Sequence, residues 1–505
     1  MNRLPHTLII GAGLGGLTAG ALLLNAGHRV TILESHVYPG GSAGTFYHKG
    51  FRFDAGATLA GGFAPGGPHA RLAEILRLEW PVQPVDPAWV VHLPDGRTIT
   101  QWTDRQQWQD EWRAAFPQTA NFWRVQEQLA DVSWDISSRP FPWPPESVHD
   151  VWTLAGALRP STRHALPYLF QTIGRVAATQ DPMFKTFLDG QLLIAAQTTA
   201  DFAHALYGSA ALDLPRRGVN HVQGGMGALA QTLADWIRAH GGEVLYRQRV
   251  TQIEVKRGRA TAVITQKGQR FSADNILANL TPWALADLLG AQTPARLQKE
   301  TARREPTWGA FTLYLGLDAA RLPHLAAGHH QVIVDHTQPL GEGNSLFISL
   351  SDEADGRRGP AGTRTATLST HTAVAPWWRL RQTGDEADYL ARRQAYTEKL
   401  LAAAEQAIPG LRQAMTLCLP GTPVTFAFYT GRPSGMVGGF PQTSLFKARG
   451  PGTGVGNVWL VGDSIFPGQS TAGVTLGGMR VAAAVLRTDR SSSSLRSIGP
   501  FLAGD

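Results

Sequence analysis

A glycine-rich turn between two apolar runs near the N-terminus restricts the possible folds of this chain more than any other stretch. It lies in TLIIGAGLGGLTAGALLLNAGHRVTILES. Gly11, Gly13 and Gly16 fit the pattern G-x-G-x-x-G, after an apolar run over 7–10 and before a helical pattern over 17–25. Glycines at these positions permit a tight turn and let the backbone approach a pyrophosphate at the N-terminus of a helix.

An acidic residue completes this pattern. The helical run stops at Gly27, and a second apolar run over 29–33 ends at Glu34. A carboxylate at this position accepts hydrogen bonds from ribose hydroxyls and would repel the extra phosphate of NADP. The glycine pattern alone is a weak signal, but strand, helix, strand and acid in register are a strong one. We therefore predict a dinucleotide-binding domain; the alternative is a glycine-rich turn without a ligand.

The residues after Glu34 favour FAD over NAD. The stretch SHVYPGGSAGTF contains Gly40, Gly41 and Gly44, and FRFDAGATL follows shortly after it. A plain NAD-binding fold continues with another strand and helix here, whereas further glycine-lined backbone suits the longer FAD molecule. The alternative is a surface loop with spare glycines.

Two later segments can extend the same sheet. The apolar run 458–461 ends in Gly462-Asp463, which is how a buried strand brings a carboxylate to a ligand. A helix predicted over 473–486 has no acid in its first turn, so its free N–H groups and positive dipole end would stabilise negative charge on a flavin. In the middle segment, Val250 follows a predicted strand over 243–246 and could contact an adenine; a core valine is the alternative.

The predicted fold class is α/β, with a discontinuous Rossmann-type domain, an α+β substrate domain and a helical insert. The boundaries are 1–70, 218–290 and 450–487 for the FAD-binding domain, 71–139 and 291–449 for the substrate domain, and 140–217 for the insert. Residues 488–505 are predicted to be disordered. The Trp- and Pro-rich insert suggests a lid over an apolar channel that dips into a membrane.

Composition narrows the partners. The formal charge is +7, but Lys and Arg do not form runs, which argues against nucleic acid and fits weak attraction to an anionic membrane surface. The single cysteine excludes an intramolecular disulfide and a cysteine metal cluster. His329–His330 is interpreted as a surface loop, and we expect no metal. Glycines interrupt the apolar run over 8–26, so we expect a soluble or peripheral cytoplasmic protein without a signal peptide.

These motifs resemble the FAD-dependent carotenoid desaturase and isomerase family, the phytoene desaturase-like relatives of the flavin amine oxidases. The likeness extends to about residue 487 and implies a glutathione-reductase-like FAD domain. The stretches at 50–72, 312–317, 426–439 and 462–474 look most like the C-3',4' desaturases, which act on acyclic or monocyclic carotenoids. Phytoene desaturases usually have a different pattern at 462–468, whereas carotenoid isomerases share this one. Ser42 replaces the arginine usual in amine oxidases, which disfavours polar amines.

The resemblance and the glycine patterns together name a set of cofactor-binding residues. They are Gly11, Gly13, Leu14, Gly15, Gly16, Glu34, Gly40, Gly41, Ser42, Gly44, Thr45, Gly56, Ala57, Thr58, Val250, Gly462, Asp463, Gly473 and Val474. The flavin would take a hydride from a 1'-hydroxylated carotenoid, and no strong base is required. The catalytic residues stay unknown, with Tyr429 and Arg432 as weak candidates.

Only one dinucleotide pattern is present, so a membrane quinone or oxygen is the expected electron acceptor. Two alternatives stay open. One is another enzyme of the same family, either a carotenoid cis-trans isomerase or a phytoene or other carotene desaturase. The other is a flavin-free prenyl- or lipid-binding protein on the same fold. We expect the protein to be peripheral on the inner face of the cell membrane.

Overall fold

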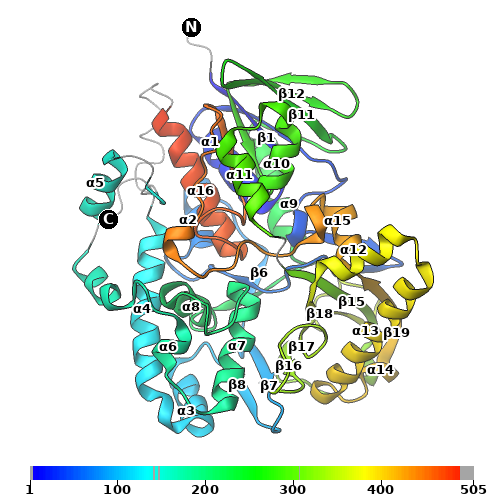
Figure 1. Ribbon diagram of the computed structural model, residues 1–505. Helices are drawn as coiled ribbons and strands as arrows, with labels where there is room; N and C mark the ends of the chain where they lie inside the picture. Colours follow the sequence, from blue (N-terminus) through cyan, green and yellow to red (C-terminus); the bar gives the residue numbers. More distant parts are fainter. Residues whose placement is uncertain (1–3, 140–142, 146–147, 158, 306–307, 489–505) are drawn as a thin grey trace.

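The computed structural model describes residues 4–139, 143–145, 148–157, 159–305 and 308–488. Figure 1 shows a parallel sheet with its helices in the upper half, a larger sheet below it, and a group of helices beside the larger sheet. The predicted tail falls on 488–505, and all of it but Thr488 lies outside the described residues. The segment at 140–142, where the predicted insert begins, lies outside them too.

The parallel sheet has five strands drawn from distant parts of the chain. Their order is β10 (Glu243–Leu245), β2 (Arg29–Leu33), β1 (His6–Ile10), β14 (Asn275–Ala278) and β20 (Val458–Leu460). Every neighbouring pair is parallel, so the carboxyl ends of all five strands meet at one edge. Ligands bind at this edge in open α/β sheets.

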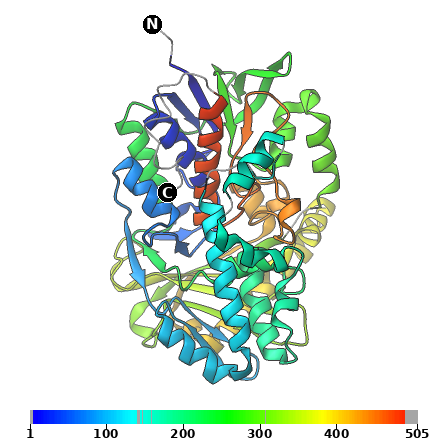
Figure 2. The same ribbon diagram turned by 90° about the vertical axis from the view of Figure 1, so that its left-hand side faces the viewer.

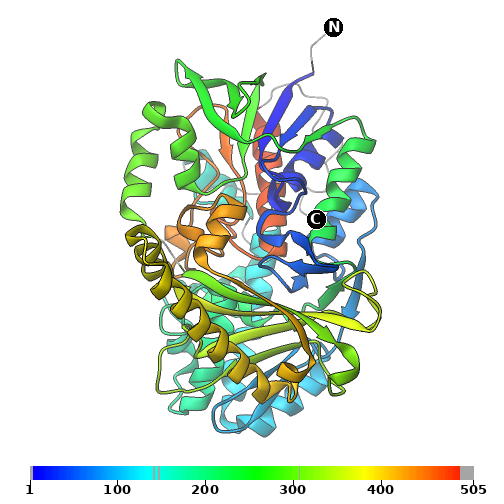
Figure 3. The same ribbon diagram turned by 90° about the vertical axis from the view of Figure 1, so that its right-hand side faces the viewer.

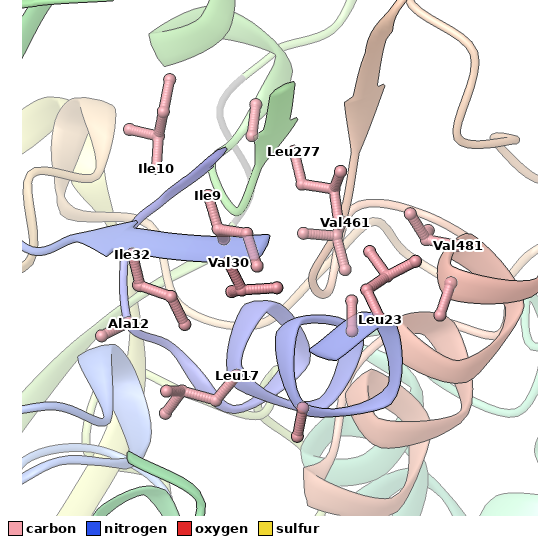
Figure 4. Close-up of a cluster of buried hydrophobic side chains, with 14 of the residues drawn as sticks. Ile9, Ile10, Ala12, Leu17, Leu23, Val30, Ile32, Leu277, Val461 and Val481 are labelled. Atoms are coloured by element: carbon pink, nitrogen blue, oxygen red, sulfur yellow. The ribbon is translucent and has the colours of Figure 1, made fainter. Parts of the chain in front are cut away.

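Three helices cover one face of the parallel sheet. They are α1 (Leu14–Asn25), α9 (Gly227–Ala239) and α16 (Thr471–Thr488). The core between sheet and helices is made of aliphatic side chains such as Ile9, Ile32, Leu17, Leu23 and Val481 (Figure 4). Figure 2 shows α16 beside α1, although the two helices lie at opposite ends of the chain. Burying such side chains stabilises the fold by roughly 25 cal/mol per Å².

Smaller elements complete this half of the molecule. They are α2 (Pro68–Leu76), α10 (Pro282–Leu289), α11 (Ala295–Arg303), the antiparallel strands β11 (Val250–Lys256), β12 (Arg259–Thr265) and β13 (Arg270–Ser272), the hairpin β3 (Thr45–His48) and β4 (Phe51–Asp54), and the connecting strands β5 (Ala60–Gly61), β6 (Val82–Val85) and β9 (Val219–Val222).

The larger sheet has seven strands. Their order is β19 (Met415–Gly421), β15 (Trp308–Asp318), β18 (Thr363–Ala373), β17 (Ser345–Leu350), β16 (His329–Ile333), β7 (Trp89–His92) and β8 (Thr98–Gln101). Only the β16–β7 pair is parallel among these seven strands. Helix α13 (Glu386–Ala407) lies across one face (Figure 3), with α12 (Val374–Thr383), α14 (Leu411–Ala414) and α15 (Pro423–Thr430) near it.

Strand alternation assigns opposite roles to the two faces of this sheet. On β15, Leu313 and Leu315 join the core under α13, whereas Tyr314 points to the other face and donates its hydroxyl to the Ala55 carbonyl at 2.6 Å. This face of the sheet therefore contacts the loop that contains Ala55. The period of two explains this division, because successive side chains of a strand point to opposite faces.

His329 and His330 correct one prediction. They are not in a surface loop but are buried in β16, in the interior of the seven-stranded sheet. The polar composition suggested exposure, yet both faces of this strand are covered. The two rings do point apart, as adjacent strand residues must: His329 contacts Ser349, and His330 contacts the Ala327 carbonyl.

The helical layer consists of α3 (Arg105–Ala115), α4 (Ala120–Ser138), α5 (Val148–Ala157), α6 (Ile173–Ala177), α7 (Pro182–Ala196) and α8 (Ala205–Leu212). Helix α4 packs on α8, so this layer includes a helix that we predicted as part of the substrate domain. Phe122, Val125, Leu129 and Val132 are buried and form the inner face of α4.

Candidate active site

The glycine turn joins β1 to α1 at the carboxyl edge of the parallel sheet. Gly11 has φ +93°, a left-handed conformation that glycine adopts without strain. Helix α1 begins at Leu14, three residues before the predicted start, so its N-terminus lies directly at the turn. A Cβ on Gly16 would lie 2.9 Å from the Gly11 carbonyl oxygen. The turn thus brings bare backbone and a helix N-terminus together, which is an anion-binding arrangement.

Glu34 lies at the end of β2 and is only 8% exposed. Its Oε2 accepts the Ala12 N–H at 2.7 Å, and its Oε1 accepts the His36 N–H at 2.7 Å. Two charge-assisted hydrogen bonds therefore hold the carboxylate beside the turn. The Gln248 N–H donates to the Glu34 carbonyl at 2.8 Å, so the segment leading to Val250 is also attached here.

Two buried polar atoms near Glu34 have no hydrogen-bond partner within the described protein. They are Nδ1 of His36 and Oε1 of Gln248. Buried polar groups are normally paired, because an unpaired one costs about 1–3 kcal/mol. The two atoms suit the donors and acceptors of an adenosine group held by Glu34. Val250, two residues after Gln248, is buried at the start of β11.

The second glycine cluster, at 40–44, lies beside the first glycine turn. A backbone bridge joins Gly13 to Gly40, and the Ala55 N–H donates to the Gly44 carbonyl at 2.9 Å. The Ala57 N–H donates to the Ser42 carbonyl at 3.1 Å, which places the loop at 55–58 against this cluster. We call the surface formed by residues 11–16, 40–44 and 55–58 the glycine cradle.

Two threonines predicted as cofactor-binding residues have hydrogen-bond partners within the protein. Thr45 donates its hydroxyl to Asp54 at 2.7 Å and accepts the Gly227 N–H at 2.8 Å, so it joins β3 to α9. Thr58 accepts a hydrogen bond from the Ser349 hydroxyl at 2.8 Å. The Thr58 hydroxyl keeps its own hydrogen for a further acceptor, whereas that of Thr45 is already committed.

The C-terminal segment forms the opposite wall, as predicted. Gly462 follows β20 with φ +114°, and a Cβ on Gly15 would lie 3.1 Å from the Val474 carbonyl and 3.4 Å from the Gly462 Cα. Gly473 lies one residue before Val474, in the first turn of α16. This contact between α1 and α16 requires glycine. The structure therefore brings the two ends of the chain together at one site.

Asp463 has a partner that the sequence did not indicate. Arg432 Nη1 donates to Asp463 Oδ2 at 2.9 Å, and the same guanidinium donates to the carbonyls of Met436 and Gly438. Arg432 thus fixes the loop at 436–438 and the carboxylate of Asp463. It acts as a positioning residue here, because its donors are directed at protein groups.

Tyr429, the other weak catalytic candidate, is 60% exposed on α15. Its ring centroid lies 6.4 Å from that of His36, near the adenosine end rather than near the apolar cavity described below. The position gives no support to a role in the reaction.

Helix α16 begins at Thr471, two residues before the predicted start. The Gly473 N–H donates to the Ser470 hydroxyl at 3.0 Å, so this N–H group of the first turn has a partner within the protein. Ser470 supplies this bond from the turn before the helix. The absence of acid from the first turn is confirmed.

Asn279 is a site residue that the sequence reasoning missed. It follows β14 directly, and its Nδ2 donates to the Gly11 carbonyl at 3.3 Å. A Cβ on Gly13 would lie 2.4 Å from this Nδ2. The signal was available, since polar residues just after parallel strands gather at the ligand-binding edge.

A deep apolar cavity of about 550 Å³ opens beside the helical layer. Its walls come from α4, the segment at 159–169, α8 and the C-terminal segment at 442–476. Ser470, Gly473 and Leu476 line it at the start of α16, so the cavity reaches the helix N-terminus at the C-terminal wall. The few polar groups in it include Gln442 and Gln469.

These two glutamines fix the backbone around the cavity. Gln469 Nε2 donates to the carbonyls of Ile194 and Ala195, at the end of α7, and its Oε1 accepts the Gly439 N–H. Gln442 Nε2 donates to the Pro467 carbonyl at 3.1 Å. Both polar atoms of Gln469 and the Nε2 of Gln442 are thereby paired with backbone groups.

Comparison with known proteins identifies the family. The family model described as flavin containing amine oxidoreductase matches residues 14–486. The chain belongs to this family. It is an FAD-dependent oxidoreductase, and Glu34, the glycine cradle and Asp463 are the groups that would hold FAD. The unpaired His36 and Gln248 atoms and the bare backbone of the cradle fit a dinucleotide.

Curated relatives of this flavoprotein cover most of its length. Prolycopene isomerase 2 of an Oncidium hybrid cultivar is 27% identical, covering 94% of this chain and 82% of its own. The neurosporene-forming phytoene desaturase of Cereibacter sphaeroides is 25% identical over 93% and 92% of the two chains. A phytoene dehydrogenase of Streptomyces griseus is 29% identical over 94% of each.

Solved structures share the fold of this flavoprotein. An oxidoreductase from Methanosarcina mazei superimposes with a TM-score of 0.64 at 19% identity, covering 95% of this chain and 100% of the other. Putrescine oxidase bound to putrescine gives a TM-score of 0.61 at 15% identity over 96% and 99%. These similarities show the fold alone.

Proposed function

We propose that this flavoprotein is a carotenoid desaturase that forms the C-3',4' double bond of an acyclic or monocyclic, 1'-hydroxylated carotenoid. The observation that carries the proposal is the apolar cavity that reaches the start of α16 at the wall of the FAD site. A polyene has no charge to recognise, so a long apolar site is what it requires. The relatives named as phytoene desaturases and prolycopene isomerases support a carotenoid substrate.

Two indole groups support an oxygenated end on the substrate. Trp134 and Trp143 line the cavity, and the Nε1 atoms of both are buried without a hydrogen-bond partner among the described residues. A tryptophan Nε1–H is a donor only. A hydroxyl group at the end of the polyene would accept from such a donor, and a pure hydrocarbon would leave both unpaired.

The protein's own groups bind and orient the reactants. FAD, when bound, supplies a hydride acceptor for the two-electron oxidation. The cavity excludes water from the reacting carbons, and Gln469 and Gln442 hold its wall. Arg432 keeps Asp463 in place at the cofactor wall. The product differs from the substrate by two hydrogens.

The electron acceptor is proposed to be a membrane quinone or oxygen. The sequence has one dinucleotide-binding pattern, at Gly11–Gly16, and FAD is the dinucleotide that this pattern binds. A quinone shares the membrane with the substrate and needs no second nucleotide site.

The protein is further proposed to lie on the inner face of the cell membrane. Large apolar side chains are exposed beside the cavity, and together we call them the insert patch. Its members are Val148, Val151, Trp152, Leu166, Phe170 and Phe446. Leu166 and Phe446 also line the cavity, and Phe170 stacks on Phe446 with ring centroids 5.5 Å apart. Among the described residues, no helix combines the length and hydropathy that crossing a membrane requires.

A carotenoid isomerase is a second candidate, because the prolycopene isomerases match over nearly the whole chain at 26–27% identity. The mass of the product separates the two activities. Oxidised holoenzyme incubated with a 1'-hydroxylated acyclic carotenoid and a quinone should give a product two hydrogens lighter, with red-shifted absorption. NADP⁺ should not replace the quinone. A product of unchanged mass and altered geometry would refute the desaturase proposal and favour the isomerase.

A further inference from the structure

A small polar cavity lies between the seven-stranded sheet and the glycine cradle. Its volume is about 20 Å³, which is enough for one water molecule. The polar residues that line it are Asp54, Thr58, His221, His329, Ser349, Ser351, Arg358 and Thr367. The reaction proposed above does not use these groups, and burying them has a cost that the fold had to offset.

Three of these side chains form a continuous hydrogen-bonded chain that ends at the cradle. His329 Nδ1 lies 2.9 Å from the Ser349 hydroxyl oxygen, and that hydroxyl donates to Thr58 Oγ1 at 2.8 Å. Because Ser349 donates to Thr58, its oxygen accepts from His329 Nδ1–H. Thr58 follows Ala57, whose N–H is bonded to Ser42 in the cradle, so the chain leads from a buried imidazole to the cofactor wall.

The other end of the cavity approaches solvent at a histidine–carboxylate pair. His221 Nε2 lies 3.1 Å from Asp355 Oδ2, and their side chains are 12% and 4% exposed. The Gly224 N–H also donates to Asp355 at 2.7 Å, which fixes the carboxylate. His221 and His329 both line the cavity, so one water in it would connect the two rings.

The remaining charges around the cavity are paired. Arg358 Nη2 donates to Asp54 Oδ2 at 2.9 Å, and Asp54 Oδ1 accepts the Met226 N–H. Burial lowers the pKa of His329 to about 3, with smaller contributions from His330 and His221. His329 is therefore neutral near pH 7, and a neutral imidazole passes a proton by exchanging the nitrogen that carries it.

We propose that Thr58, Ser349 and His329 form a proton conduit between the cofactor cradle and the His221–Asp355 pair. The proposal rests on the flavin chemistry proposed above. Desaturation takes a hydride and a proton from the substrate, so the proton must leave a buried site, and any proton that the reduced flavin gives up on reoxidation must leave it too.

The transfer balances at every atom. Thr58 Oγ1 would take the proton that is released at the cradle when the reduced cofactor is oxidised, and it gives its own hydrogen to Ser349 Oγ, which gives its own to His329 Nδ1. His329 then releases its Nε2 proton to the cavity, towards His221. Each residue gains one proton and loses one, His329 gaining it at Nδ1 and losing it at Nε2, and no electrons move. The observed arrangement, with Ser349 donating to Thr58, is the one that an outward transfer leaves behind. A flip of the His329 ring, which exchanges the places of its two nitrogens, together with rotation of the two hydroxyls restores the starting state.

The test follows proton release in the FAD-loaded protein without any carotenoid. Photoreduced holoenzyme is mixed with ferricyanide in weak buffer containing a pH indicator. Ferricyanide takes electrons but no proton, so any proton lost on flavin oxidation must reach the solvent. In the unmodified protein the indicator should respond together with the return of flavin absorbance. In Ser349→Ala the proton should appear about 10²-fold later, the lower limit for a positioned proton-transfer group.

Matched variants separate the conduit from general damage. Ser349→Thr keeps the hydroxyl and should behave as the unmodified protein. Ser351→Ala removes a hydroxyl that lines the same cavity but only accepts the Thr365 N–H, so it should not delay the proton. If Ser349→Ala loses FAD, His329→Gln decides, because an amide cannot exchange tautomers. Simultaneous flavin and indicator signals in the deciding variant would overturn the conduit, and leave the carotenoid proposal untouched.

Discussion

At the scale of single residues, Glu34 and Gly13 test the cofactor site most directly. Glu34→Arg removes the acceptor of the Ala12 and His36 N–H groups and places a cation in a space that is 8% exposed. Gly13→Val brings a side chain to where a Cβ is already 2.4 Å from Asn279 Nδ2. Both variants should purify without flavin absorbance.

A milder substitution of Glu34 gives a change in FAD affinity that can be measured. Glu34→Gln keeps the shape and removes the charge, and hydrogen bonds to charged groups contribute about 1.5–3 kcal/mol. FAD affinity by titration should therefore fall about 10- to 100-fold. Asp287→Arg, on an exposed position of α10, is the control and should keep full flavin content. Normal flavin in Glu34→Arg would mean that another acid holds the ribose.

Some single residues of the site could be predicted from the sequence and others could not. Gly11, Gly13 and Glu34 could be predicted because their spacing along the chain is itself the signal. The pairing of Arg432 with Asp463 and of Ser349 with Thr58 could not, since each joins residues far apart in sequence. His329 was misjudged because a polar pair on a strand looks exposed until both faces of the sheet are seen to be covered.

At the scale of elements, the packing of α1 against α16 depends on Gly478. A Cβ there would lie 2.5 Å from the Gly15 carbonyl and 2.9 Å from the Thr18 Cβ. Gly478→Ala would have to push the two helices apart, and overpacking of this kind costs about 1–3 kcal/mol. Thermal unfolding should show the loss, and FAD affinity should fall because both helices border the cofactor site.

Gly156 offers a matched control within another helix. It lies in α5 with no atom within 4 Å of an added Cβ. Gly156→Ala should be neutral or stabilise the helix by up to about 1 kcal/mol, from helix propensity alone. If both substitutions shift the unfolding temperature equally, close packing at Gly478 is not the cause.

Most elements could be predicted closely because each has a local pattern. Strand β2 matches its predicted bounds, and β10 and β20 differ from theirs by one residue at one end. The starts of α1 and α16 were placed two or three residues late. Glycines in a first turn look like loop, yet they form helix once the opposite backbone packs against them. Packing therefore overrode propensity at the site itself.

At the scale of the whole molecule, the sequence indicated that one sheet is assembled from three separated segments, and the structure joins strands from all three in one five-stranded sheet whose neighbouring pairs are parallel. The apolar cavity could not be predicted in the same way. Its walls come from the helical layer and from residues 442–476, and apolar residues of a cavity wall have the same pattern as those of a core. Only the relative placement of the segments distinguishes the two.

The insert patch leads to a prediction about membranes. Trp152 and Phe170 are 73% and 78% exposed beside a cavity suited to a lipid-soluble substrate. Burying one such side chain in a bilayer contributes about 1.5–3 kcal/mol, so Trp152→Ser with Phe170→Ser should weaken binding to anionic vesicles at least 100-fold in flotation assays. Phe428→Ser is the control, because Phe428 is 75% exposed on α15, outside the patch.

The formal charge of +7 should make binding weaker on neutral vesicles and at high salt. Equal binding by both variants, or none by the unmodified protein at low salt, would show that the insert patch does not face a membrane.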